Sequence, residues 1–240
     1  MKLSELKTSE NIKVLAYGPS STGKTCFACS FPTPTLYMDF DNKVSSAAQF
    51  YKKDQLRLEQ IDVKAYAQMP RETRMKSFNQ DLFEIQKLQH AGSPLPFKTL
   101  VIDSLTTLTH YLLEDYIHVS QRGIKRPTEG INSMQDYQFL DKHMTQMITG
   151  LLSLNCNVVF IGHSRAEKDE STGNIANAVL MPGQFSGKLP IFFEEVYFAK
   201  VDSTGKYLMQ TQSDAKSVCR TQRGLAKEIP ATFSSIVAAL

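Results

Sequence analysis

The stretch Gly18-Pro-Ser-Ser-Thr-Gly-Lys-Thr25 decides the fold, because it matches the phosphate-binding pattern GxxxxGK[ST] at every fixed position. A β-rich run over 12–17 leads into it, and a helix is expected from Lys24 to about Ser30. Lys24 is expected to reach the β- and γ-phosphates, and the Thr25 hydroxyl to bind Mg²⁺. The loop is therefore predicted to bind ATP or a close relative through Gly18, Pro19, Ser20, Ser21, Thr22, Gly23, Lys24 and Thr25.

The composition is that of a soluble globular protein, with 42% hydrophobic and 21% charged residues. A chain of 240 residues suits one α/β domain, so we expect a single domain over 1–240 with its core at about 12–225. The polar start and the lack of a run of roughly 18 apolar residues predict no secretion signal and no membrane contact. The net charge of +3 permits nucleic-acid binding without requiring it.

Two of the four cysteines form a CxxC pair, Cys26-Phe-Ala-Cys29, just inside the helix after the loop. A zinc site normally needs four ligands, and the sequence offers no second pair. We therefore expect these cysteines to pack against the sheet.

Strand-like runs alternate with helical patterns through most of the chain. Strands are expected at 12–17, 35–40, 58–67, 98–103 and 157–162, with helices at 24–30, 71–90, 105–119 and 134–154. The last third should form a hairpin of 195–201 with 206–212, a final strand near 216–220 and a short helix from Pro230. This pattern predicts an α/β fold with a mostly parallel central sheet and an antiparallel hairpin extension at the C-terminal end.

A second carboxylate that holds Mg²⁺ is expected at the end of the buried strand Leu100-Val-Ile-Asp103. Such a strand fixes the Asp103 carboxylate beside the phosphate loop. The next residue is Ser104, whereas many ATP-driven machines place a water-activating Glu there. The catalytic base must therefore come from elsewhere in the chain.

These motifs, with Tyr37-Met-Asp-Phe-Asp41 and Val159-Phe-Ile-Gly-His163, resemble in order and spacing the RecA-like P-loop NTPase core. Because it lacks a large N- or C-terminal domain, the chain looks most similar to the minimal-core single-strand annealing ATPases of bacteriophages, the Sak group. Those proteins are related to phage AAA-family nucleotide-binding proteins. The resemblance runs from about Ile12 to Leu225. It implies an ATPase that uses Mg²⁺, binds single-stranded DNA, promotes annealing or homologous recombination, and acts in the cytoplasm of a phage-infected bacterium.

The resemblance also implies catalytic roles for two polar residues at strand ends. Asp41 stands where RecA-type proteins usually carry the Glu that polarises water, and Asp39, two residues earlier, is a rival. His163 stands where that family usually has a Gln that senses the γ-phosphate, which adds a titratable group. We favour Asp41 as the base.

Two polar segments lie where recombinases carry their DNA-binding loops. The first, 121–127, is basic, and Arg122, Lys125 and Arg126 are candidate phosphate contacts. The second follows His163 as a long polar segment expected to be a loop, with Arg165 and Lys168 as candidates, although neighbouring acidic residues oppose their charge. Either segment could equally be a solvated surface.

Arg220 and Arg223 near the C-terminus lie where RecA-type proteins place basic residues that reach a neighbouring subunit's ATP. They imply a homo-oligomer, either a ring or a filament, and a single-strand-binding protein is a further possible partner. Three alternatives stay open. The chain could be a non-recombinase P-loop ATPase such as a helicase loader or motor, an ATP-gated DNA-binding mediator with little turnover, or a small-molecule kinase. The kinase would need an arginine-rich lid, and the arginines here are scattered.

Overall fold

The computed structural model describes residues 10–117, 132–168 and 175–238. The strands of this part are β1 (Lys13–Gly18), β2 (Thr35–Asp39), β3 (Ile61–Ala65), β4 (Thr99–Asp103), β5 (Asn157–Lys168), β6 (Ile175–Val179), β7 (Glu195–Val201), β8 (Tyr207–Gln210) and β9 (Glu228–Pro230). The α-helices are α1 (Lys24–Cys29), α2 (Ser45–Phe50), α3 (Gln55–Glu59), α4 (Arg71–His90), α5 (Leu105–Tyr111), α7 (Met134–Leu152), α8 (Phe185–Lys188) and α9 (Phe233–Val237). Shorter turns of 3₁₀-helix are η2 (Tyr66–Gln68) and η4 (Leu189–Phe192), and the π-helical turn η3 (Leu112–Ile117) continues α5. None of the described helices combines the length and the apolar character that a membrane crossing requires.

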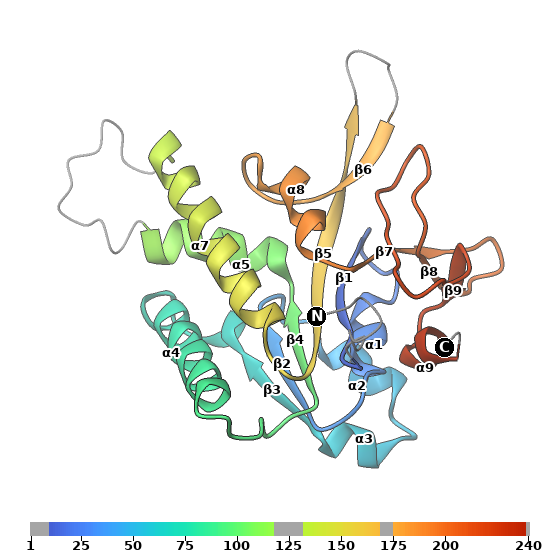
Figure 1. Ribbon diagram of the computed structural model, residues 1–240, viewed down its shortest axis with the longest axis horizontal. Helices are drawn as coiled ribbons and strands as arrows, with labels where there is room; N and C mark the ends of the chain where they lie inside the picture. Colours follow the sequence, from blue (N-terminus) through green and yellow to red (C-terminus); the bar gives the residue numbers. More distant parts are fainter. Residues whose placement is uncertain (1–9, 118–131, 169–174, 239–240) are drawn as a thin grey trace, which may run out of the picture.

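The described strands form one sheet in the order β3-β2-β4-β5-β1-β7-β8-β9, with β6 attached to β5 (Figure 1). The pairings from β3 to β7 are parallel, whereas β7–β8, β8–β9 and β5–β6 are antiparallel. β5 separates β1, which leads into the phosphate loop, from β4, which ends at Asp103. The predicted fold class, a RecA-like P-loop NTPase with a parallel central sheet and a C-terminal antiparallel extension, is therefore confirmed.

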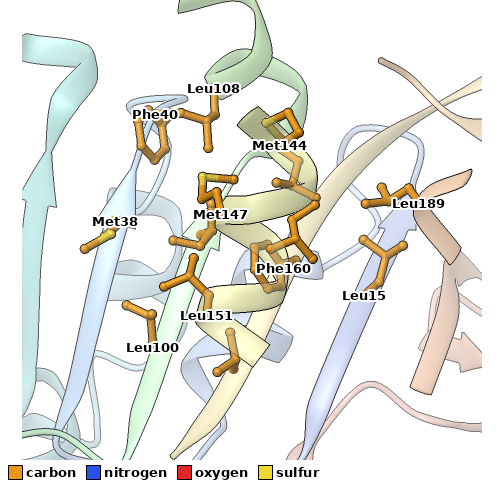
Figure 2. Close-up of a cluster of buried hydrophobic side chains, with 14 of the residues drawn as sticks. Leu15, Met38, Phe40, Leu100, Leu108, Met144, Met147, Leu151, Phe160 and Leu189 are labelled. Atoms are coloured by element: carbon orange, nitrogen blue, oxygen red, sulfur yellow. The ribbon is translucent and has the colours of Figure 1, made fainter. Parts of the chain in front are cut away.

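Helices cover both faces of this sheet, and the alternation of side chains along each strand divides the core in two. In β1, Leu15 joins one buried cluster and Val14 the other. On the first face, α7 packs Met147 and Leu151 against the central strands (Figure 2). On the second face, α1 contributes Phe27. Because the central strands are buried on both faces, they are apolar at nearly every position, which is why the sequence revealed them.

The parallel register brings the carboxyl ends of four strands to the same edge. Gly18 at the end of β1 lies opposite His163 of β5. Asp39 at the end of β2 lies opposite Asp103, the last residue of β4. The polar residues that follow these buried strands therefore meet at one place, although they are far apart in sequence.

The segment after His163 is not the loop that the sequence predicted. β5 continues to Lys168 and pairs with β6, from Ser164 opposite Val179 to Lys168 opposite Ile175. The two strands form a ribbon that extends beyond the sheet (Figure 1). The polar composition misled the prediction because a ribbon outside the core needs no apolar alternation to satisfy its backbone hydrogen bonds.

The predicted final strand near 216–220 is wrong, and β9 takes its place in the sheet. In this segment only Ser217 and Arg220 form isolated bridges. The Asp214 side chain accepts hydrogen bonds from the backbone N–H of Lys216 and of Ser217. Such local bonds compete with a ladder and hold the segment in a turn.

The cysteines of the CxxC pair are free thiols and have the predicted packing role. Cys29 is buried beside α1's other apolar residues, and Cys26 packs against the same cluster. Burial raises the pKa of the Cys29 thiol to about 12.

Candidate active site

A cavity of about 580 Å³ lies where the carboxyl ends of β1, β2, β4 and β5 meet. Residues from six separate parts of the chain line it, and nine of them are predicted site residues. These are Ser20, Ser21, Thr22, Gly23, Lys24, Thr25, Asp41, Asp103 and His163. The cavity is thus the candidate active site.

The phosphate loop has the conformation that its glycines allow. Gly23 has a φ of 79° and caps α1, and a side chain there would collide with the ring of Tyr207 on β8. Lys24 is buried and folds back over the loop, donating hydrogen bonds from Nζ to the carbonyl oxygens of Gly18 (2.9 Å) and Pro19. Burial lowers the pKa of Lys24 to about 8, although Asp103 and Asp41 act in the opposite direction. Anionic phosphate groups in the cavity would favour the charged ammonium.

Asp103 and Thr25 form the candidate metal site. The Thr25 hydroxyl donates a 3.0 Å hydrogen bond to Oδ2 of Asp103, and the buried Tyr37 hydroxyl donates to the same oxygen from behind. Burial raises the pKa of Asp103 to about 6, and the nearby carboxylates of Asp41 and Asp39 add to that increase. Hydroxyl and carboxylate oxygens are the ligands that Mg²⁺ prefers, and a divalent cation would relieve this crowding of negative charge. The donor set therefore fits the predicted ion.

The structure separates the roles of the two candidate carboxylates at the end of β2. Asp39 is buried and accepts hydrogen bonds from the backbone N–H of Asp41 (3.0 Å) and Val44 (3.3 Å), so it shapes the turn after the strand. Asp41 lines the cavity and contacts His163, with 2.7 Å between Oδ2 and the ring nitrogen Nε2. This geometry supports Asp41, and not Asp39, as the carboxylate of the site.

Asp41 is held by three side chains. Oδ1 accepts hydrogen bonds from the hydroxyls of Ser104 (2.9 Å) and Thr107, and Oδ2 faces His163. Burial alone would raise the pKa of Asp41, but the hydrogen bonds from His163, Thr107 and Ser104 outweigh it and hold the pKa at about 2. Asp41 is therefore ionised at neutral pH.

This depressed pKa predicts how stability depends on pH. Because the pKa of Asp41 in the folded state lies below its value in the unfolded chain, the ionised group stabilises the fold above pH ~4, and this contribution is lost as the pH falls towards 2. We expect the difference in unfolding free energy between the wild type and Asp41→Asn to be smaller at pH 3 than at pH 6. Urea unfolding at both values measures it. Asp62→Asn, at an exposed position of β3, is the control. A difference independent of pH would contradict the prediction.

The candidate DNA contacts divide into described and undescribed residues. Arg165 and Lys168 lie on the outer half of β5, where Arg165 forms an ion pair with Glu167 and Lys168 is exposed. Arg122, Lys125 and Arg126 lie outside the described residues. Glu167, one of the acidic neighbours that the sequence analysis expected to oppose the charge of Arg165, is thus in direct contact with it.

The two arginines predicted to act on a neighbouring subunit do not line this chain's own cavity. Arg220 donates a hydrogen bond to the Phe193 carbonyl (3.2 Å), and Arg223 approaches the buried Glu195 at 3.8 Å. Glu195 begins β7, at the amino end of the parallel sheet, whereas the phosphate loop follows the carboxyl end. A role in a neighbour's site would require that subunit to approach this opposite end.

Several residues of the site were not predicted from the sequence. Tyr37 fixes Asp103, Thr107 fixes Asp41, and Tyr207 covers Gly23. Phe50 and Lys43 also line the cavity. Only Tyr37 carried a signal, since strand alternation places it on the same face as Asp39. The others reach the site through tertiary packing that no local pattern records.

Comparison with known proteins places the chain in context. Residues 10–221 match the AAA_24 family, described as an AAA domain. No curated protein matches the chain. The solved structures that resemble it include a KaiC-like protein from the hyperthermophilic archaeon Pyrococcus horikoshii OT3, with 15% identity, coverage of 91% of this chain and 84% of that one, and a TM-score of 0.47. The flagellar accessory protein FlaH from Methanocaldococcus jannaschii has 10% identity, coverage of 91% and 83%, and a TM-score of 0.43.

Proposed function

The chain belongs to the AAA_24 family of AAA domains, and from this premise we propose that it is an ATPase stimulated by single-stranded DNA that promotes annealing or homologous recombination. Family membership, the phosphate loop and the strand order make it a RecA-like P-loop ATPase domain. The DNA substrate, assembly into a homo-oligomer with ATP at the subunit interface, and action in a phage-infected bacterium rest on the sequence resemblance.

One observation carries the proposal of ATP hydrolysis: a single cavity brings together the phosphate loop, the candidate metal site and the Asp41–His163 pair. Lys24 supplies positive charge to the phosphates and neutralises charge that develops during their transfer. Mg²⁺, held by Thr25 and Asp103, would add Lewis-acid stabilisation of the same oxygens. The Asp41–His163 pair offers hydrogen bonds that orient a water molecule opposite the leaving group.

The β5–β6 ribbon supports the proposed link to DNA. It begins directly after His163, so the chain passes without interruption from the cavity to Arg165 and Lys168. The ribbon projects beyond the rest of the sheet (Figure 1). Cations on such a ribbon would contact phosphates without reading the base sequence.

We expect single-stranded DNA to increase the rate of ATP hydrolysis, and this increase to diminish when the basic residues are removed. Two variants test the two segments: Arg165→Ala with Lys168→Ala, and Arg122→Ala with Lys125→Ala and Arg126→Ala. Each lost phosphate contact should reduce the slope of log affinity against log salt by about 0.7 for single strands. Steady-state hydrolysis and DNA titrations over a salt series measure both effects. Lys53→Ala, at an exposed position outside the cavity, is the matched control.

Hydrolysis that does not respond to DNA in the wild type would contradict the recombination proposal and favour another P-loop ATPase, such as a helicase loader or motor. One observation favours the ATP-gated mediator as a second candidate. Asp41 already accepts three hydrogen bonds from its own chain, which leaves this carboxylate little capacity to activate water. DNA binding that requires ATP, without turnover, would identify that mediator.

A further inference from the structure

We propose that His163 is the general base that takes the proton from the attacking water, and that Asp41 is a positioning residue that holds the imidazole ring. This inference rests on the proposed ATP hydrolysis and reverses the roles expected from the sequence. Three features of the cavity carry it: the hydrogen-bond partners of Asp41, the orientation of the His163 ring, and the exposure of the two side chains.

Asp41 is poorly placed to act on water itself. Oδ1 accepts hydrogen bonds from Ser104 (2.9 Å) and Thr107, and Oδ2 lies 2.7 Å from Nε2 of His163. Its side chain is only 5% exposed. A carboxylate has about four acceptor positions, and three of them are occupied by these donors. A general base must reach the proton that it removes, and protein atoms surround most of this one.

His163 has the access that Asp41 lacks. Its side chain is 21% exposed and lines the cavity together with Lys24. A carboxylate can only accept hydrogen bonds, so the contact with Asp41 requires the proton of the neutral ring to lie on Nε2. Nδ1 is then an acceptor, and it has no hydrogen bond to any group in the described parts of the chain.

The backbone fixes the ring in this place. The N–H of His163 donates to the Thr106 hydroxyl (3.0 Å), and its carbonyl accepts from the N–H of Leu180 (2.7 Å). His163 is also the last residue of β5 in register with β1. A base on a strand held from both sides is more precisely located than one on a loop.

The charged groups around the ring come from several elements. Asp41 and Lys43 follow β2, with 4.0 Å between Lys43 Nζ and Asp41 Oδ2; Asp103 ends β4; and Lys24 begins α1. Of these, only Asp41 is in direct contact with His163. Its negative charge stabilises the imidazolium that forms when Nδ1 takes a proton, as in an Asp–His pair of a hydrolase.

The reaction step is balanced as follows. An O–H bond of water breaks as its proton moves to Nδ1, and the water oxygen forms a bond to the γ-phosphorus. The bond from that phosphorus to the bridging oxygen breaks, and its electron pair leaves with ADP. Inorganic phosphate is the second product, and the proton returns from Nδ1 to phosphate or solvent.

His163→Gln tests this role, because glutamine keeps a hydrogen-bonding side chain but cannot take a proton at neutral pH. We expect at least a ~100-fold lower single-turnover rate of ATP hydrolysis, within the usual contribution of a general base. His90→Gln, at the exposed end of α4, is the matched control. If His163 only senses phosphate, glutamine will retain the rate to within about threefold, and that result overturns the proposal.

The ring itself gives a readout that does not depend on activity. Two-bond ¹H–¹⁵N spectra of labelled protein distinguish the ring tautomers, and we expect His163 to carry its proton on Nε2. Asp41→Asn should shift the ring away from this tautomer and lower the rate, while ATP binding is retained. A neutral ring protonated on Nδ1 in the wild type would overturn the inference.

The two proposals fail in different ways. A wild type that binds but never hydrolyses ATP would overturn the ATPase proposal and the role of His163 with it. A wild type that hydrolyses ATP, accompanied by an equally active His163→Gln and an inactive Asp41→Asn, would overturn only the assignment of the base.

Discussion

Replacing Lys24 with alanine is expected to lower the rate of ATP hydrolysis by about 1000-fold, as removal of a positioned charge-stabilising group does in other enzymes. The ammonium group is buried at the floor of the loop and is held there by the carbonyl oxygens of Gly18 and Pro19. Charge on the transferring phosphate would develop next to this buried ammonium, where an electrostatic interaction is stronger than in bulk water. Single-turnover hydrolysis of radiolabelled ATP measures the effect.

The matched control for this variant is Lys53→Ala, which removes an equal charge from an exposed position outside the cavity. Its rate should equal that of the wild type. Thermal unfolding of Lys24→Ala is needed alongside, because the loss of the lysine leaves loop carbonyls without their donor. A folded Lys24→Ala that hydrolyses ATP within threefold of the wild type would show that the loop is not the site of hydrolysis.

Gly18→Ala is expected to destabilise the fold by ~3 kcal/mol or more, which is at the upper end of the cost of overpacking. A Cβ atom at this position would lie 2.5 Å from the carbonyl oxygen of Ala199 and 3.2 Å from its Cβ. Ala199 belongs to β7, which is paired with β1 on one side and β8 on the other. Its backbone therefore cannot move away without disturbing both ladders. Urea unfolding followed by circular dichroism measures the change.

Gly187→Ala provides the comparison for this substitution, since a Cβ at that position in α8 would meet no other described part of the chain within 4 Å, apart from its own helix backbone and chain neighbours. Alanine is the better helix former, so this variant should be unchanged or slightly more stable. Equal stability of Gly18→Ala and Gly187→Ala would show that the approach of β7 to the loop is looser than the structure describes.

The fold could be predicted from the sequence because its decisive elements are local. A strand buried on both faces is apolar along its whole length, and the phosphate loop fixes what precedes and follows it. The hairpin of β7 with β8 was predicted across 202–205, where the Asp202 side chain accepts hydrogen bonds from the backbone N–H of Thr204 and Lys206. These features are set by residues that are neighbours in the chain.

The site could be predicted only in part, because its chemistry depends on contacts between distant segments. The sequence indicated that Asp41, Asp103 and His163 end or follow strands, and the parallel register brings them together. It carried no indication that Thr107 and Ser104 would saturate one oxygen of Asp41. Those two hydroxyls lie more than 60 positions away along the chain, and their contacts follow from how α5 leaves β4.

The length of β5 has a mechanical consequence. Inside the sheet the strand is fixed on both edges, by β4 as far as Ile161 and by β1 as far as His163, and from Ser164 onward it pairs only with β6. The ribbon is anchored a second time, because the backbone N–H of Asn177 on β6 donates to the carbonyl oxygen of Lys216 and the Asn177 side chain donates to the Ser217 hydroxyl (3.2 Å). A load on the outer ribbon would therefore be shared between two supports. One is His163, whose side chain lines the cavity, and the other is the 216–217 segment near the C-terminal end.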